Sequence, residues 1–209
     1  MDFARIVAWF RESTGWAHRT RVATAAIDPW QRFDLEPPLR AFGPGAEEFR
    51  QYLERETHVA ATTPQAIGEY LLACHYAEDV HLLDEHDAWL HPATFELLRA
   101  GDCEDFALWA WRKLLEAGYD AVFVVGMRCI PETPRGRHAW VMFRDGKDEF
   151  LLDGVERTLP RMVRPLHEVR ESYEPQVGVA AAARRFVYAG LYREAWGRAL
   201  RLRPVPRRA

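Results

Sequence analysis

The sequence predicts an α+β fold, with one helix packed on an antiparallel sheet and helical extensions at both ends of the chain. Two patterns carry this prediction. Apolar residues recur at helical spacing before about residue 100, and beyond Gly101 one capped helix is followed by three segments that alternate like strands. The 209 residues are 48% hydrophobic, which is enough to bury one sizeable core.

Residues 1–60 are expected to form a helical arm that packs on the core. Four apolar side chains near the start lie at helical spacing: Phe3, Ile6, Val7 and Phe10. An irregular stretch rich in proline and arginine then runs to Gly45. The pattern of residues 46–58 predicts a surface helix that turns Phe49 and Leu53 inward.

Residues 61–160 are expected to form the core. Thr63 and Pro64 supply an N-cap and a first-turn proline for a helix that reaches about Leu83, and a short helix follows Pro92. Further along, the spacing predicts a longer helix and then a β-sheet.

That longer helix carries a cysteine at its start. Asp102 can cap the helix, Asp105 follows three residues later, and Gly118 follows its end. Cys103 then lies in the first turn, where the helix dipole and unpaired N–H groups favour the thiolate. The neighbouring carboxylates, Glu104 among them, oppose this effect unless they are turned away, act as caps or bind a cation.

Three strands are predicted next: AVFVVGMRCI at 121–130, HAWVMFR at 138–144 and EFLLD at 149–153. If Asp145 and Gly146 form the loop between the last two, His138 lies directly opposite Asp153. A two-residue shift would leave this pair diagonal on one face, whereas a one-residue shift would separate it. The other face presents an apolar set to the core: Val141, Phe143, Phe150 and Leu152.

Residues 161–209 are expected to form a C-terminal helical extension with a basic tail. Eight arginines stand against the single Glu194 from Arg184 onward. Several apolar residues there can form one stripe: Phe186, Val187, Leu191, Ala195 and Leu202. Packing of this stripe on the core is the simpler interpretation, and an anionic partner for the basic helix is the alternative.

The composition argues against several classes of function. A net charge of −3 gives no reason to expect a nucleic-acid partner. No integral membrane segment and no secretory signal is apparent, so a cytoplasmic location is expected. The three cysteines, Cys74, Cys103 and Cys129, form no CxxC pair, which argues against a disulfide framework or a thiolate zinc site. No cofactor is expected.

Histidines and carboxylates also gather between residues 74 and 91. The histidines after His75 are His81, His86 and His91, at spacings of six, five and five. These spacings fit neither one helical face nor a zinc pattern. A solvated helix and loop is therefore expected.

The segments AWLHPATFELLRAGDCEDFAL, GRHAWVMFRDG and FLLDGVE together resemble the transglutaminase-like superfamily, and most closely its bacterial transglutaminase-like cysteine proteinases. The resemblance covers about residues 86–156. It implies a papain-like core in which Cys103 is the nucleophile, His138 the general base and Asp153 the orienting carboxylate. It also implies attack on an amide or ester carbonyl of a protein or peptide, with hydrolysis ahead of transamidation.

Other interpretations remain open beside this one. Arylamine N-acetyltransfer uses the same order of residues, and a catalytically silent binding module could dock through the basic C-terminal helix. Asp102 and Glu104 match positions at which some exported members bind calcium, but Asp102 already has a role as a cap, so we expect no calcium effect. Four residues are candidates for substrate binding: Trp89, Trp140, Arg135 and Arg137.

Overall fold

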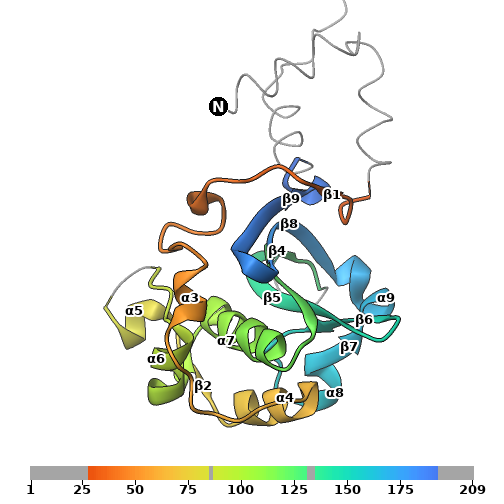
Figure 1. The fold of residues 1–209 in the computed structure, drawn as a ribbon. Helices are drawn as coiled ribbons and strands as arrows, with labels where there is room; N and C mark the ends of the chain where they lie inside the picture. The colour runs from red at the N-terminus through yellow and green to blue at the C-terminus, as the bar shows by residue number, and fades with distance from the viewer. Residues whose placement is uncertain (1–27, 85–86, 131–134, 193–209) are drawn as a thin grey trace, which may run out of the picture.

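The computed structural model describes residues 28–84, 87–130 and 135–192 (Figure 1). Its largest element is an antiparallel sheet of seven strands: β1 (Arg32–Phe33), β4 (Asp120–Arg128), β5 (Gly136–Asp145), β6 (Asp148–Leu152), β7 (Val163–Pro165), β8 (Tyr173–Ala180) and β9 (Arg184–Tyr188). The strand order is β1-β9-β8-β4-β5-β6-β7. A short parallel pair joins β2 (His75–Tyr76) to β3 (Ala100–Gly101).

One long helix, α7 (Cys103–Glu116), lies against one face of the sheet and contacts β4 and β5. Its other side is covered by α3 (Gln51–Glu54), α4 (Pro64–Leu72) and α6 (Pro92–Leu98) (Figure 1). Shorter elements connect these: η2 (Leu39–Ala41), α5 (Asp79–Leu82), α8 (Leu159–Met162), α9 (Leu166–Val169), η3 (Arg170–Ser172) and η4 (Ala181–Ala183). The predicted α+β fold, with a helix packed on an antiparallel sheet, is confirmed. No helix among the described residues is long and apolar enough to cross a membrane.

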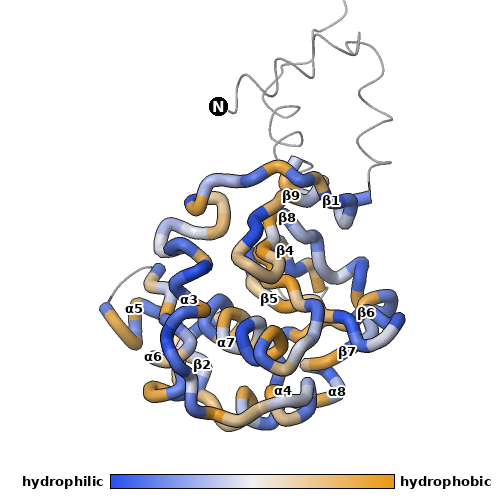
Figure 2. The backbone as a smooth tube through the Cα atoms, in the orientation of Figure 1, coloured by the Kyte–Doolittle hydropathy of each residue, from blue (hydrophilic) through white to orange (hydrophobic). Residues whose placement is uncertain are grey.

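The two central strands are apolar on both faces because both faces are covered. Phe123 and Val141 point into the core that contains α7. Val124 and Trp140 point into a second core on the opposite face, which Tyr173 of β8 also joins. Figure 2 shows the resulting hydrophobic stretches along β4 and β5, between more hydrophilic outer segments.

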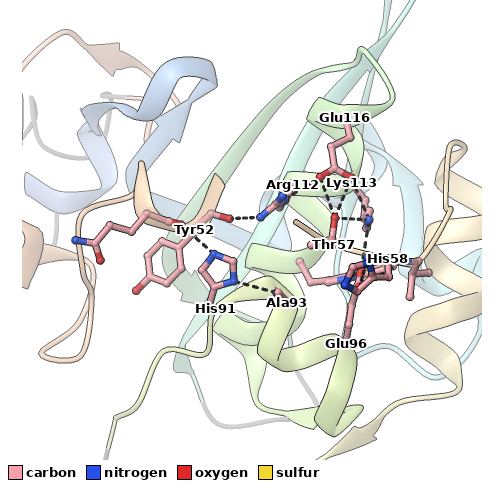
Figure 3. Close-up of polar contacts among 12 residues, drawn as sticks. Tyr52, Thr57, His58, His91, Ala93, Glu96, Arg112, Lys113 and Glu116 are labelled. Atoms are coloured by element: carbon pink, nitrogen blue, oxygen red, sulfur yellow. Dashed lines mark hydrogen bonds and ion pairs between the residues drawn. The ribbon is translucent and has the colours of Figure 1, made fainter. Parts of the chain in front are cut away.

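A buried polar network fixes the C-terminal half of α7 (Figure 3). The Lys113 Nζ lies 3.3 Å from Glu96 Oε1, and both side chains are at most 5% exposed. Glu96 also accepts hydrogen bonds from the Trp109 indole at 2.9 Å and from the His58 backbone at 2.6 Å. Pairing and hydrogen bonds offset the desolvation cost of burying these charges. The network ties the C-terminal half of α7 to α6 and to residues 57–58.

Several predicted helices begin where expected but are shorter. Thr63 caps α4 by accepting a hydrogen bond from Ala66 N at 3.1 Å, as predicted. The helix ends at Leu72 and does not reach Leu83, because the chain turns at 73–74 and His75 enters β2. The helix predicted over 46–58 is confined to α3, although Phe49 is buried and Leu53 packs on the core as expected.

The predicted C-terminal helix is wrong over residues 184–188, whereas residues 189–192 are helical. Residues 184–188 form β9, which pairs with β8 and places both strands in the central sheet. The physical reason is that successive side chains in this segment point to opposite faces of the sheet, as they do in a strand. Phe186 and Tyr188 pack on one face of the sheet and Val187 on the other. The predicted N-terminal helix and the basic tail beyond residue 192 lie outside the described residues.

Candidate active site

Cys103 is the first residue of α7, and the turn before it is fixed by Asp105. Asp102 is the N-cap residue with an extended backbone. The Asp105 carboxylate accepts hydrogen bonds from Asp102 N at 3.2 Å and from Leu90 N at 2.7 Å. The predicted role of Asp102 and Asp105 at the helix start is confirmed. Asp105 additionally ties the segment around Leu90 to this turn.

His138 and Asp153 meet, although not in the predicted register. The loop residues are Gly146 and Lys147, because Asp145 pairs with Asp148. Gly146 has a φ of +61°, which glycine adopts without strain. The pairing is therefore shifted by two residues from the predicted one, and direct opposition is wrong. His138 Nε2 nevertheless lies 2.9 Å from Asp153 Oδ1, as two residues on one face allow.

Asp153 is completely buried and surrounded by donors. The Tyr173 hydroxyl donates to Oδ2 at 2.7 Å, and Val155 N donates to Oδ1 at 3.3 Å. Arg128 Nε lies 3.6 Å from Oδ2. Burial alone would raise the pKa of Asp153, but His138, Arg128 and Tyr173 together hold it below its ordinary value. The carboxylate thus stays charged and directed at the imidazole.

Neither Tyr173 nor Arg128 could be recognised as a site residue from the sequence alone. Tyr173 reaches the site because it lies opposite Arg128 in the β4–β8 pairing, and no strand was predicted over 173–180. Arg128 also forms an ion pair with Glu156, which Arg161 contacts from the other side at 3.0 Å. The pair at the centre of the site is thus embedded in a charge network drawn from β4, β8 and the chain after β6.

Cys103 and His138 both line a cavity of about 180 Å³. Its lining includes Phe42, Asp87, Trp89, Asp102, Cys103, Glu104, Val125, Arg137, His138 and Ala139. The backbone of Ala139, next to His138, acts to lower the pKa of the Cys103 thiol, although burial and the neighbouring carboxylates outweigh it. Two larger hollows, of about 570 and 380 Å³, lie around Arg144, Leu166 and Arg170 and contain none of the predicted site residues.

Carboxylates crowd the thiol. Cys103 Sγ donates a hydrogen bond to Glu104 Oε2 at 3.1 Å. Burial raises the pKa of the Cys103 thiol well above its ordinary value, and the charges of Glu104 and Asp102 raise it further. Burial also raises the pKa of Asp102 to about 9 and that of Asp105 to about 8. The conflict expected from the sequence is therefore real, and the capping of the helix does not remove it.

The same carboxylates could hold a cation. Oxygens of Asp79, Asp102 and Asp105 lie within 4.8 Å of one another, as do those of Asp79, Asp87 and Glu104. Asp102 Oδ1 is buried without a hydrogen-bond partner. Asp79 is 3% exposed and accepts a hydrogen bond from the Ala88 backbone, so this part of the 74–91 stretch is not the solvated surface that was expected. Clustered carboxylate oxygens suit calcium.

Two of the four predicted substrate-binding residues line the cavity. Trp89 is one of them, and Arg137 is the other. The Arg137 guanidinium donates to the Ala41 carbonyl at 2.6 Å and to the Phe42 carbonyl. It therefore holds residues 41–42 against the cavity through the two N–H groups of Nη2.

The other two predicted substrate-binding residues do not line the cavity. Trp140 is fully buried, because it points into the core on the far face of the sheet, where its ring stacks 6.3 Å from that of His138. Arg135 is drawn away by an ion pair of 3.2 Å with Glu174. The structure thus gives neither side chain a direct contact with a substrate in the cavity.

Several solved structures are similar to part of this chain. No protein-family model and no curated protein matches the sequence. EGTA-treated LapG of Legionella pneumophila matches 60% of this chain and 65% of its own, with 18% identity and a TM-score of 0.46. A second LapG structure matches 66% and 74% at the same identity and score. A TGase matches 73% of this chain and 37% of its own, with 14% identity and a TM-score of 0.35.

The chain is similar to these structures over only part of their length. The aligned part spans slightly less than two thirds of the first LapG chain and little more than a third of the TGase chain. Likeness at these identities describes the fold alone. In this α+β fold, the start of α7 meets β5 at the cavity that Cys103 and His138 line.

Proposed function

We propose that the chain is a cysteine-dependent amide-bond hydrolase or acyl transferase that acts on a protein or peptide. Cys103 is the nucleophile, His138 the general base and then acid, and Asp153 the orienting carboxylate. The observation that supports this best is the 2.9 Å contact between His138 Nε2 and the buried Asp153, at the edge of a cavity that Cys103 lines.

The contacts define the proton path of the proposed reaction. Because Nε2 of His138 faces Asp153, Nδ1 is the nitrogen left to exchange a proton with Cys103. The thiolate forms a C–S bond to the substrate carbonyl, and the C–N bond then breaks as Nδ1–H protonates the leaving amine. Water, or an acceptor amine, attacks the thioester and gives a proton to Nδ1. The C–S bond breaks, and the thiolate returns.

The raised pKa of Cys103 requires a source of positive charge. A protonated His138 supplies part of it. A cation held by Asp79, Asp102 and Asp105, or by Asp79, Asp87 and Glu104, would supply the rest, because it would neutralise carboxylates that oppose the thiolate. Asp102 Oδ1, which has no hydrogen-bond partner, fits this role. A calcium effect is therefore expected, in contrast to the expectation from the sequence.

Labelling by iodoacetamide, read by peptide mass, tests the proposed nucleophile. With calcium at pH 6 to 7, Cys103 should react well ahead of Cys74, whose pKa burial raises, and of Cys129. His138→Gln should remove this advantage. Equal labelling of the three cysteines, or the same Cys103 rate in His138→Gln, would contradict the proposal.

The substrate class has its own test. Proteins that are cleaved or cross-linked in cells with the wild-type chain should be intact in cells with Cys103→Ala. Identical protein profiles in the two strains would count against amide-bond chemistry, even if Cys103 labels rapidly.

A further inference from the structure

We propose that Tyr173 and Arg128 are positioning residues for the Cys103–His138–Asp153 site. This inference rests on the proposed function, because it concerns how the orienting carboxylate is held. Neither residue lines the cavity, so neither contacts a substrate there. Both act through Asp153.

The two oxygens of Asp153 have separate partners. Oδ1 faces His138 Nε2 at 2.9 Å, and Val155 N donates to the same oxygen at 3.3 Å. Oδ2 accepts from the Tyr173 hydroxyl at 2.7 Å and lies 3.6 Å from Arg128 Nε. An aspartate carboxylate can rotate about its Cβ–Cγ bond, but here any rotation would break contacts at both oxygens. The partners of Oδ2 therefore keep Oδ1 aimed at the imidazole.

Tyr173 is suited to this role by its own surroundings. It is 1% exposed, so water does not compete for its hydroxyl proton. Burial raises the pKa of Tyr173, and the neighbouring Asp153 raises it further, so the hydroxyl remains a donor. Its ring also packs edge to face against Trp140 at 5.1 Å, and Trp140 stacks on the His138 ring. Tyr173 thus constrains both members of the pair.

Arg128 is held on its other side. Its guanidinium pairs with Glu156, which is 7% exposed and also pairs with Arg161. The ring of Tyr173 lies 6.0 Å from the guanidinium. Arg128 is therefore fixed from three directions and cannot leave Oδ2 without breaking other contacts.

The test is the rate of Cys103 alkylation by iodoacetamide in the full chain with calcium. Tyr173→Phe removes only the hydroxyl and should slow the reaction about tenfold, as expected for loss of a hydrogen bond to a charged group. Tyr188→Phe is the matched control, because Tyr188 is a buried tyrosine of β9 that packs on Trp30 and Phe186. It should leave the rate unchanged. Circular dichroism establishes that each variant is folded at the assay temperature.

A double-mutant cycle separates positioning from a general structural effect. In the Asp153→Asn background, Tyr173→Phe should change the rate less than twofold, because the group through which it acts is gone. Equal losses in both backgrounds, or no loss in the wild-type background, would overturn the inference. If Tyr173→Phe does not fold, Arg128→Gln is carried through the same cycle with the same criteria.

The outcomes also separate this inference from the proposed function. If wild type and His138→Gln label at the same rate, the proposed function falls and the inference falls with it. If they differ while Tyr173→Phe and Arg128→Gln both match wild type, the inference alone is wrong.

Discussion

At the scale of single residues, the main feature of the site is that carboxyl groups near Cys103 and His138 have pKa values shifted in opposite directions. Asp102 and Asp105 prefer their neutral forms because they are buried, while Asp153 prefers its charged form because donors surround it. Asp102 lines the cavity beside Cys103, whereas Asp153 lies behind His138, which lines the same cavity. Their opposite preferences predict how stability and reactivity depend on pH and on calcium.

We expect the calcium-free protein to be less stable at pH 9 than at pH 6. A carboxyl whose folded pKa is raised stabilises the fold at low pH, and this stability is lost as the pH rises through the folded value. Those values are about 9 for Asp102 and about 8 for Asp105. The contribution of Asp153 has the opposite sign, and it is lost only at acid pH, as the pH falls from its ordinary range through its lowered pKa.

Melting temperatures measured from pH 5 to pH 9 in chelator provide the test. Asp102→Asn should flatten the decline on the alkaline side, whereas Glu149→Gln, on an exposed surface pair with Arg144, should not. A melting temperature that rises steadily from pH 6 to pH 9 in wild type would contradict the prediction.

Calcium should reverse the alkaline loss of stability. At pH 8 the cation would take the place of protons on the clustered carboxylates, so millimolar calcium should raise the melting temperature with the logarithm of its concentration over its dissociation constant. It should also speed alkylation of Cys103. Asp102→Asn and Glu104→Gln should each lose both effects, and Glu149→Gln should keep them. Identical melting curves in calcium and in chelator would exclude a site there.

At the scale of elements, the turn between β8 and β9 is strained. Ala182 and Ala183 both have a φ of 58°, a left-handed conformation that disfavours residues with a Cβ atom. Ala182→Gly and Ala183→Gly should each raise the free energy of unfolding by about 1 kcal/mol. Urea denaturation measures the change. Ala181→Gly, whose φ is not positive, is the control and should give no gain; a loss of stability in the first two variants would contradict this assignment of strain.

The same turn explains why the C-terminal strands could not be predicted from the sequence. Four consecutive alanines at 180–183 favour a helix locally, and the apolar residues after them fit a helical stripe as well as a strand. The pairing of β8 with β4 decides the matter, and these strands lie far apart in the sequence. By contrast, α7 was predictable because its cap, its period and its terminal glycine are all local signals.

The β5–β6 hairpin shows how a partly correct prediction can reach the right site. The alternation of Val141, Phe143, Phe150 and Leu152 fixed which face carries His138 and Asp153. It did not fix the loop, because Asp145-Gly146 and Gly146-Lys147 both place a glycine in the turn. A shift of two residues leaves each side chain on the same face of the sheet, so His138 and Asp153 are still neighbours. Tyr173 could not be found in this way because its strand was not predicted.

At the scale of the whole molecule, the buried Lys113–Glu96 pair should contribute strongly to stability. Glu96→Gln removes the buried countercharge of Lys113 and leaves it only the ion pair of 3.0 Å with the more exposed Glu116, which should lower the free energy of unfolding by about 3 kcal/mol. Urea denaturation followed by circular dichroism measures the loss. Glu116→Gln, at a site whose side chain is 42% exposed, should lower it by less than about 1 kcal/mol. Equal effects of the two variants would contradict the importance of burial.

The position of the cavity between α7 and the sheet links chemistry to the integrity of the whole fold. Cys103 is carried by the helical layer, whereas His138, Asp153 and Tyr173 are carried by the sheet or its margins. Neither layer holds a complete site. If Cys103 is the nucleophile, as proposed, its reactivity depends on the docking of the two layers, and a chain in which both layers had formed but stayed apart would not react. Such a chain would therefore not be acylated during synthesis or partial unfolding.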